Sequence, residues 1–412
     1  MSAKRRGGGD TIIAGLLVAL ILGFAIRAAA NPLTVTSGVI LNEEYNDNVH
    51  FDNHKEDDYI TTLAVGVHLL YQTPASTTSL ATGVGGSYFA RKTAASVNLA
   101  QGQRLLYSTT YQYSPQLSFS ISDGLARVGS RARGLNSDAG VDTSTTAQNL
   151  PQVNQSGINV LLPRGTAFTN FFSATSSYLL SPRWAAAFSV TNGVSTFSDP
   201  NSTDVSYGLG PNVSYRLSED LSLNSGYTYS RFYNSNAPDS EGHTATVGAT
   251  YTPAPLWSVF GSVGGSVNLP TGNSNQSTRT SATFSVGMDR QFATSSLAIA
   301  VQQGLTPSAG VAGTSNTLGG YVYYTIFLTD HLTGLLDTSY TNYDTTSGSF
   351  SVYQGYATLR YAIWRQVSAG FVYAYRRSDA NQGLSNVQHG VVDQNIVLIQ
   401  IGTTFDLWRL DV

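Results

Sequence analysis

Large apolar and small or polar residues alternate with a period of two along much of the chain. In the stretch YITTLAVGVHLLY (residues 59–71), Leu63, Val65 and Val67 share one face, while Thr62 and Ala64 share the other. This period is typical of a β-strand with one apolar face. Twelve residue steps at about 3.3 Å, tilted by about 40°, rise roughly 30 Å. A strand of this length can cross the hydrocarbon core of a membrane.

Short polar or proline-containing breaks separate the alternating segments, and longer Asn-, Asp-, Gly- and Ser-rich loops lie between them. From residue 181 onward the breaks recur about every 35–40 residues, which indicates a repeated hairpin. Eight breaks separate nine hairpins and predict about 18 strands. The breaks lie near Pro74, Pro115, Pro182, Ser218, Pro255, Thr294, Thr329 and Trp364, and the loops at 46–57, 91–98, 124–164, 198–203, 234–241, 269–277, 306–315, 344–349 and 379–392.

The predicted fold class is all-β, a transmembrane antiparallel β-barrel. A β-sandwich also buries one face of each strand, but its strands are mostly about 5–6 residues long. A β-solenoid has a shorter repeat and lacks aromatic residues at both ends of its strands. The length of the alternating segments therefore favours the barrel over both.

The first residues carry the pattern of a secretory signal peptide. Basic residues 4–6 precede an apolar run over residues 12–26, which is followed by Arg27 and three alanines at 28–30. The alternative is an inner-membrane anchor, but the run is shorter than the roughly 20 residues of a spanning helix. We expect residues 1–30 to be cleaved and residues 31–412 to form the barrel. Residues 124–164 are either a long outer loop or an insert in the lumen.

Composition narrows the class of protein. Only 11% of the 412 residues are charged, against about 25% in typical soluble proteins. There are 24 Tyr, 17 Phe and 40 Gly but no Cys, which excludes disulfides and thiolate chemistry. The net charge of −3 gives no reason to expect a nucleic-acid partner. A mean hydropathy of −0.07 is too low for a bundle of membrane helices.

The parity of the strands assigns candidate residues to the two faces. Polar-face charges are expected to line a water-filled pore and tune which solutes pass; the alternative is that they pair with each other to stiffen the wall. These predicted pore-lining residues are Arg104, Arg216, Asp289, Asp337, Arg360 and Arg376. Aromatic residues on the apolar face are expected to form girdles at the membrane interfaces. The predicted girdle residues are Tyr59, Tyr71, Tyr107, Tyr113, Tyr207, Tyr215, Tyr353, Tyr361 and Tyr375.

Nothing in the sequence indicates catalysis or a cofactor. The six histidines stand at no spacing typical of a catalytic or metal site, and glycine clusters such as GVGG (83–86) precede no helix. We therefore predict no catalytic residues, no metal site and no cofactor. The acidic loop NDNVHFDNHKEDD (46–58) leaves two interpretations open, a calcium site or a solvated acidic loop.

One stretch resembles a known family. EYNDN (44–48) and DDYIT (57–61) resemble the opening hairpin of the beta-barrel porin 2 family, Gram-negative outer-membrane barrels, and the turn YLLSPRW (178–184) is similar as well. The resemblance implies a connection to exopolysaccharide export. It also implies a terminal aromatic residue for the barrel assembly machinery, whereas this sequence offers Phe405 or Trp408 further inward.

The functional expectation is an outer-membrane channel for small hydrophilic solutes or for saccharide export. The alternative is a plugged barrel with a structural or surface-display role. We expect both termini in the periplasm. The expected partners are outer-membrane lipid and lipopolysaccharide, the barrel assembly machinery and polysaccharide-export components.

Overall fold

The structure is a computed structural model that describes residues 33–91, 97–128, 167–198, 201–235, 237–271, 277–307, 314–345, 348–381 and 390–410. The regular elements in these ranges are β-strands. They are β1 (Leu33–Asn46), β2 (Asp58–Gln72), β3 (Ser76–Phe89), β4 (Val97–Gln112), β5 (Leu117–Val128), β6 (Ala167–Leu179), β7 (Trp184–Ser198), β8 (Asn201–Arg216), β9 (Leu221–Asn234), β10 (Ala237–Ala254), β11 (Trp257–Pro270), β12 (Arg279–Gln291), β13 (Ser295–Pro307), β14 (Thr314–Phe327), β15 (Leu332–Asp344), β16 (Ser349–Trp364), β17 (Val367–Ala380) and β18 (Gly390–Leu410). Within the described ranges, no helix is both long and apolar enough to cross a membrane.

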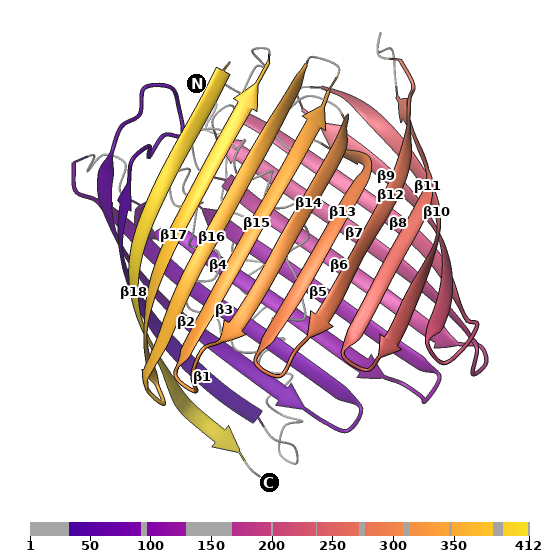
Figure 1. The fold of residues 1–412 in the computed structure, drawn as a ribbon, viewed down its shortest axis with the longest axis horizontal. Helices are drawn as coiled ribbons and strands as arrows, with labels where there is room; N and C mark the ends of the chain where they lie inside the picture. The colour runs from indigo at the N-terminus through magenta and orange to yellow at the C-terminus, as the bar shows by residue number, and fades with distance from the viewer. Residues whose placement is uncertain are drawn as a thin grey trace, which may run out of the picture.

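The strands form one closed antiparallel barrel. Each strand pairs with its neighbours in sequence, and β1 closes the ring by pairing with β18 from Leu33–Leu410 to Asn46–Ile396. Figure 1 shows the strands tilted around a common axis, with the first strands behind the last ones. The strands run from 12 residues in β5 to 21 in β18, longer than is usual in globular proteins. The prediction of an 18-stranded barrel is confirmed.

Eight short turns lie at one end of the barrel, at the eight predicted breaks. Five of these turns share one device, a Ser or Thr whose hydroxyl accepts the backbone N–H of the residue three positions later. This side chain replaces a backbone partner where the ladder ends. The pairs are Thr73–Ser76, Ser114–Leu117, Ser181–Trp184, Ser218–Leu221 and Thr329–Leu332, at 2.8–3.1 Å.

Some strands extend further into the predicted loops than the sequence indicated. β7 ends at Ser198 and β8 begins at Asn201, so most of the loop predicted at 198–203 is strand. β5 likewise continues to Val128, inside the loop predicted at 124–164. Polar residues show where the apolar band of the wall ends, but the hydrogen-bonded pairing of the strands can continue past that point. The predicted signal peptide and most of the long 124–164 segment lie outside the described residues.

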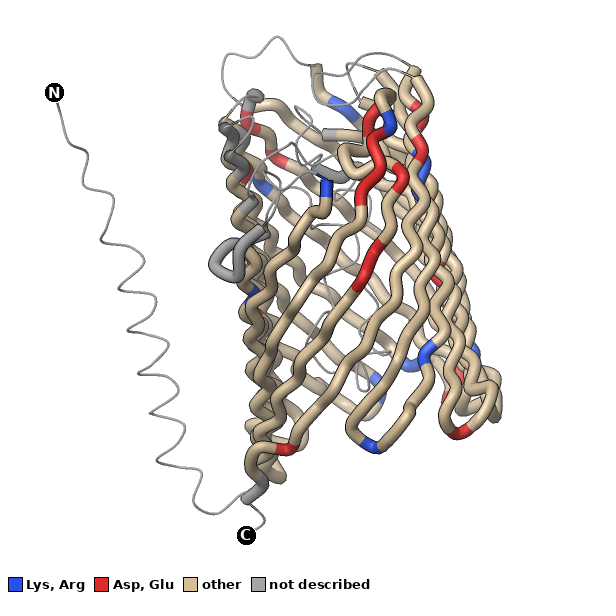
Figure 2. The backbone as a smooth tube through the Cα atoms, turned by 90° about the vertical axis from the view of Figure 1, so that its left-hand side faces the viewer, with Lys and Arg blue, Asp and Glu red and all other residues tan. Residues whose placement is uncertain are grey.

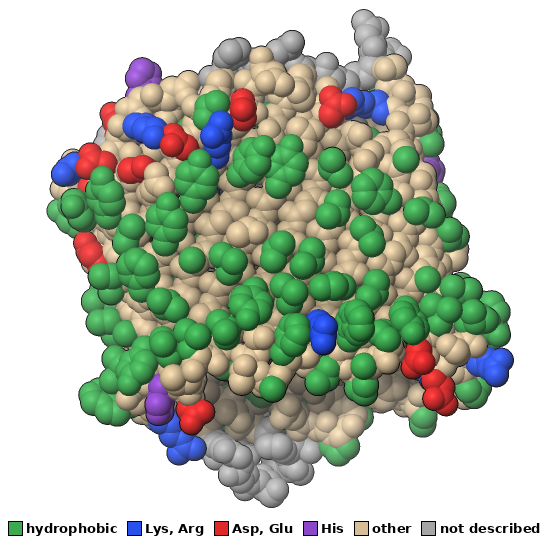
Figure 3. Space-filling view, viewed as in Figure 1, with side chains coloured by type: hydrophobic (Ala, Val, Ile, Leu, Met, Phe, Trp, Pro, Cys, Tyr) green, Lys and Arg blue, Asp and Glu red, His purple; other side chains and the backbone are tan. Residues whose placement is uncertain are grey.

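The outer face of the barrel is apolar. Large hydrophobic side chains stand exposed and in register across neighbouring strands, as in the pair Val65 and Val84 and the row Leu359, Phe371 and Ile399. Figure 3 shows such side chains over a broad band, with most charged side chains above and below it. The residues between them in sequence point to the inner face.

The inner face is less uniformly polar than the alternation predicts. On β16 and β18, Phe350, Val352, Ile396 and Leu398 point inward and are almost fully buried. On β18 these residues alternate with equally apolar outward ones such as Val397 and Ile399, so the period of two is weak there. On β16 Phe350 and Val352 flank Ser351, so the apolar side chains at the long-loop end lie on the opposite face from those in the rest of the strand. The expectation of small polar residues throughout the inner face is wrong for this part of the wall.

The first loop, residues 47–57, fastens the two closing strands together at the long-loop end. The Asp47 carboxylate accepts the backbone N–H of Asn395 at 2.6 Å and its side-chain amide at 2.8 Å. The Lys55 ammonium lies 2.6 Å from the Asp393 carboxylate. Asp47 and Asn395 are 348 residues apart in sequence. Figure 2 shows acidic and basic residues gathered towards this end of the wall.

The Lys55 ammonium keeps its positive charge at pH values near neutrality. The hydrogen bond to Asp393 raises the pKa of Lys55 above its ordinary value of 10.5, more than the small effect of burial lowers it. Because the pKa of Lys55 is raised in the folded state, its ion pair stabilises the fold at every pH below the ordinary lysine pKa. This stabilisation is lost only when the pH rises above the pKa of Lys55 in the folded protein. The attachment of the loop to β18 should therefore not depend on pH near neutrality.

Separate substitutions of two adjacent residues on opposite faces of β8 test which face is the outer one. Val213 is exposed on the outer face and Asn212 is exposed on the inner face. If lipid covers the outer face, Val213→Arg should cost about 2–4 kcal/mol and lower the yield of folded barrel, with the larger cost nearer mid-membrane. Asn212→Arg should fold as the wild type. The heat-dependent shift of unboiled protein on SDS gels measures folding, and equal damage from both variants would contradict the assignment.

Removing the Asp47 carboxylate tests the fastening role of the first loop. Asp47→Ala leaves two N–H donors of Asn395 without their charged acceptor, so we expect a loss of about 2–4 kcal/mol in unfolding free energy. Asp57→Ala is the control, because its ion pair with Arg91 is exposed on both sides and should contribute under about 1 kcal/mol. Urea unfolding in detergent micelles measures both, and equal stabilities would exclude the fastening role.

Candidate functional site

The six charged residues predicted to line the pore all lie on the inner face. Their neighbours in sequence carry the outward side chains; Leu359 and Tyr361, on either side of Arg360, are about half exposed. The strand register gives the same face to Arg104, Arg216, Asp289, Asp337 and Arg376.

These six residues differ in how far they are exposed. Arg216, Asp289 and Arg360 are exposed, and Arg104 and Asp337 are half-buried. Arg376 is only 7% exposed. The first three side chains are therefore accessible from inside the barrel, whereas Arg376 is held within the wall.

Arg376 belongs to a polar row that crosses three strands. Gln354, Arg376 and Gln394 are in register on β16, β17 and β18. The Arg376 guanidinium donates to the Tyr356 hydroxyl at 2.9 Å, and that hydroxyl donates to Gln354 Oε1 at 3.0 Å. Gln394 in turn donates to Asn46 Oδ1 at 3.0 Å. The row connects the inner face of β16 to the closing strand β1, which favours a stiffening role for Arg376.

Inward-facing tyrosines accompany the carboxylates on β12 to β16. Asp289, Ala298, Tyr323, Asp337 and Tyr356 form one register row across these strands. Tyr321 lies on the same face, one row closer to the long loops. The wall therefore combines carboxylates with aromatic faces and hydroxyl groups, which can contact a hydrophilic solute in more than one way.

The sequence analysis did not select the inward tyrosines. The stretch YVYYT (321–325) places tyrosines at both parities, so alternation alone does not divide them. The available signal was the neighbouring strand, where Ala298 and Ala300 share the inner face with Tyr323 and Tyr321. Because that signal depends on register, it required the pairing of β13 with β14.

Aromatic residues on the outer face gather towards both ends of the wall. At the long-loop end Tyr59 packs against Tyr45 at 5.2 Å and Tyr353 against Tyr340 at 4.7 Å between ring centroids. At the turn end Trp184 packs against Tyr215 at 4.6 Å. Of the other predicted girdle residues, Tyr207 and Tyr375 lie towards the long loops and Tyr71, Tyr113 and Tyr361 towards the turns. Tyr107 is outward but further from the turn than Tyr111, in register with Asp123.

The carboxylates of the acidic first loop contact side chains both within the loop and on neighbouring segments. Asp57 lies 2.6 Å from the Arg91 guanidinium, and Glu56 lies 3.1 Å from the His50 ring. Within the described ranges, His, Asp and Glu side chains do not come together in groups of three or more that could hold a metal ion. The calcium interpretation of residues 46–58 therefore gains no support.

Comparisons with known proteins add a likeness of fold. No family model and no curated protein matches the sequence, so the resemblance to the beta-barrel porin 2 family stays a prediction. Among solved structures, OccK2 (OpdF) of Pseudomonas aeruginosa is 10% identical with a TM-score of 0.48, over 91% of this chain and 98% of that one. The outer membrane protein OpdK of Pseudomonas aeruginosa is 11% identical with a TM-score of 0.46, over 90% and 99%. OccAB4 of Acinetobacter baumannii is 11% identical with a TM-score of 0.46, over 92% and 99%.

The Tyr356 hydroxyl tests whether the polar row stiffens the wall. Tyr356→Phe removes one acceptor from Arg376 and one donor from Gln354, so the free energy of unfolding should fall by about 1–3 kcal/mol. Tyr353→Phe is the matched control on the same strand, since its ring keeps the outward pair with Tyr340. Urea unfolding in micelles compares the two, and an unchanged Tyr356→Phe would show that the row does not stabilise the barrel.

Proposed function

We propose that the protein is an outer-membrane channel for the passive passage of small hydrophilic solutes. The observation that carries the proposal is the contrast between the two faces of one closed wall. The outer face exposes large apolar side chains, and the inner face carries exposed charges of both signs, such as Arg216, Arg360 and Asp289. Barrels well above 8 strands leave an aqueous channel rather than a packed core.

A membrane location follows from the same contrast. An apolar band of this size on a soluble protein would drive aggregation, whereas hydrocarbon would cover it at no cost. The closed ladder also gives every strand two partners, as hydrocarbon requires. By the usual arrangement of outer-membrane barrels, the short turns face the periplasm. Leu33 and Leu410 pair at the turn end, so in this proposed orientation both ends of the described part of the chain face the periplasm.

Wall charges bias the permeant ions, so the exposed inner charges should set selectivity. In planar bilayers the wild type should give stepwise conductance. Arg216→Glu with Arg360→Glu should shift selectivity towards cations, and Asp289→Arg with Asp337→Arg towards anions, each by roughly twofold or more in the permeability ratio. Reversal potentials in a salt gradient measure the ratio.

Arg290→Gln is the matched control for these reversals, because Arg290 follows Asp289 in sequence but lies outward, over Trp257. It should leave selectivity unchanged. If neither double variant changes the permeability ratio, these four residues do not lie on the conduction path.

A plugged barrel with a structural role is the second candidate, and one observation favours it. The inward side chains of Phe89, Phe350 and Ile396 are buried, although an open lumen would expose them to water. A silent bilayer with folded, membrane-inserted protein would support this candidate over the channel. Saccharide export is a narrower form of the channel proposal, and neighbouring genes for a polysaccharide exporter would support it.

A further inference from the structure

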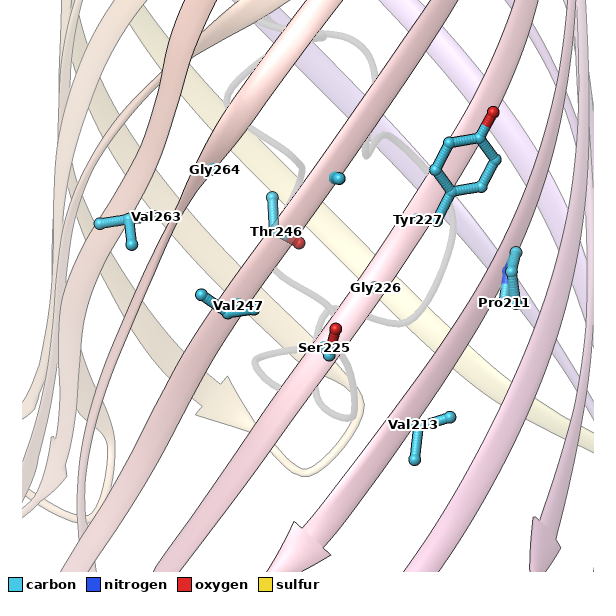
Figure 4. Close-up of a pocket in the computed structure, with 10 residues that line it drawn as sticks. Pro211, Val213, Ser225, Gly226, Tyr227, Thr246, Val247, Val263 and Gly264 are labelled. Atoms are coloured by element: carbon cyan, nitrogen blue, oxygen red, sulfur yellow. The ribbon is translucent and has the colours of Figure 1, made fainter.

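The outer face of β8 to β11 carries an indentation that the conduction proposal does not explain. Its volume is about 430 Å³, and it is lined chiefly by Pro211, Val213, Ala245, Val247 and Val263. The indentation is shallow and open to the surroundings, and its lining is mostly apolar. Figure 4 shows Val213, Val247 and Val263 around the groove and Tyr227 nearer the long-loop end.

The local sequence explains why the wall is hollowed there. Pro211 has no N–H to donate, and the ladder between β8 and β9 is interrupted at Gly210 and Pro211. The outward positions Ser225 and Ala245 are small, so the floor of the groove is formed by short side chains and backbone. The larger side chains of Val213, Val247 and Val263 stand exposed around this floor.

A strip of polar residues leads from the groove to the long-loop end on the same outer face. His243 Nδ1 lies 2.6 Å from the Tyr227 hydroxyl, and its ring packs on Tyr229. One register step further up, Arg231 and Glu241 form an ion pair at 3.4 Å. Ionisable groups on a membrane face are costly and usually functional.

The distance between the polar strip and the apolar groove suits a molecule with a polar head and an extended acyl chain. Six residue steps of β9 separate Arg231 from Ser225, roughly 20 Å along the strand at about 3.3 Å per residue. A polar head at Arg231 would therefore place an extended acyl chain along His243 and Tyr227 and into the groove. Arginine suits phosphate because it offers five N–H donors, and the pairing with Glu241 leaves donors for a ligand.

We propose that this strip and groove bind one molecule of the phosphorylated glycolipid of the outer leaflet, the lipid A part of lipopolysaccharide. Its phosphate lies at Arg231 and one acyl chain fills the groove. The head is assigned to the outer leaflet because Arg231 lies at the long-loop end of the wall. The inference rests on the proposed position of the barrel in the outer membrane and does not depend on conduction.

The test measures lipid A bound to delipidated wild-type protein in detergent by native mass spectrometry, with phosphatidylcholine as the comparison lipid. Ala245→Leu fills the groove, and Ala357→Leu makes the same change at an exposed outward position on β16. We expect one tightly bound lipid A per barrel, lost by at least about tenfold in affinity in Ala245→Leu and kept in Ala357→Leu. Arg231→Gln should weaken lipid A but not phosphatidylcholine.

Three results would overturn the proposal. They are unchanged lipid A binding by Ala245→Leu, equal binding of phosphatidylcholine and lipid A by the wild type, and a wild-type oligomer that Ala245→Leu alone converts to monomers. The last would make the groove an interface between copies of this chain. Conductance of Ala245→Leu should equal that of the wild type, so a silent wild-type channel that still binds lipid A would refute only the conduction proposal.

Discussion

Every other feature of this barrel depends on the pairing of β1 with β18. A sheet with two free edges would leave a row of N–H and C=O groups without partners, and hydrocarbon offers none. The fourteen residues of β1 are paired on both sides, with β2 and with β18. Closure turns the alternation of side chains into an outside and an inside. It also permits long strands whose outer side chains are apolar, since no edge remains to recruit another chain.

The two faces meet different demands, and the wall satisfies them with different chemistry. Outside, apolar side chains suffice over most of the surface, and polar groups such as His243 and Arg231 are held by neighbours. Inside, charges occur both exposed to the lumen, as at Arg360, and held within a hydrogen-bonded row, as at Arg376. A formal charge on the inner face is therefore not by itself accessible from inside the barrel. The strand neighbours of each residue decide whether it is exposed or buried.

The sequence predicted the strand number and the side of each named charge because both follow from local patterns. Ser181 and Ser218 end strands by local hydrogen bonds, and parity needs only the neighbouring residues. It did not predict the inward Ile396, Tyr321 and Tyr323, since apolar residues at both parities conceal the face. It missed the inward Phe350 for another reason, because Phe350 stands between two serines and the apolar parity of β16 is reversed at that end. The contact of Asp47 with Asn395 was also beyond reach, because it depends on which strands close the ring.

That contact has a consequence for the order of assembly. A hydrogen bond between segments 348 residues apart forms only after the intervening chain is in place, because the entropy cost of joining distant segments is offset only once the wall brings them together. Residues 47–57 are made early, yet they acquire their anchor from a strand near the other end. Residues 47–57 can therefore take up their folded position only when the barrel is complete. In a wall still missing its last strand, the first loop would remain accessible to proteases and chaperones. These proteins could thereby distinguish an incomplete barrel from a closed one.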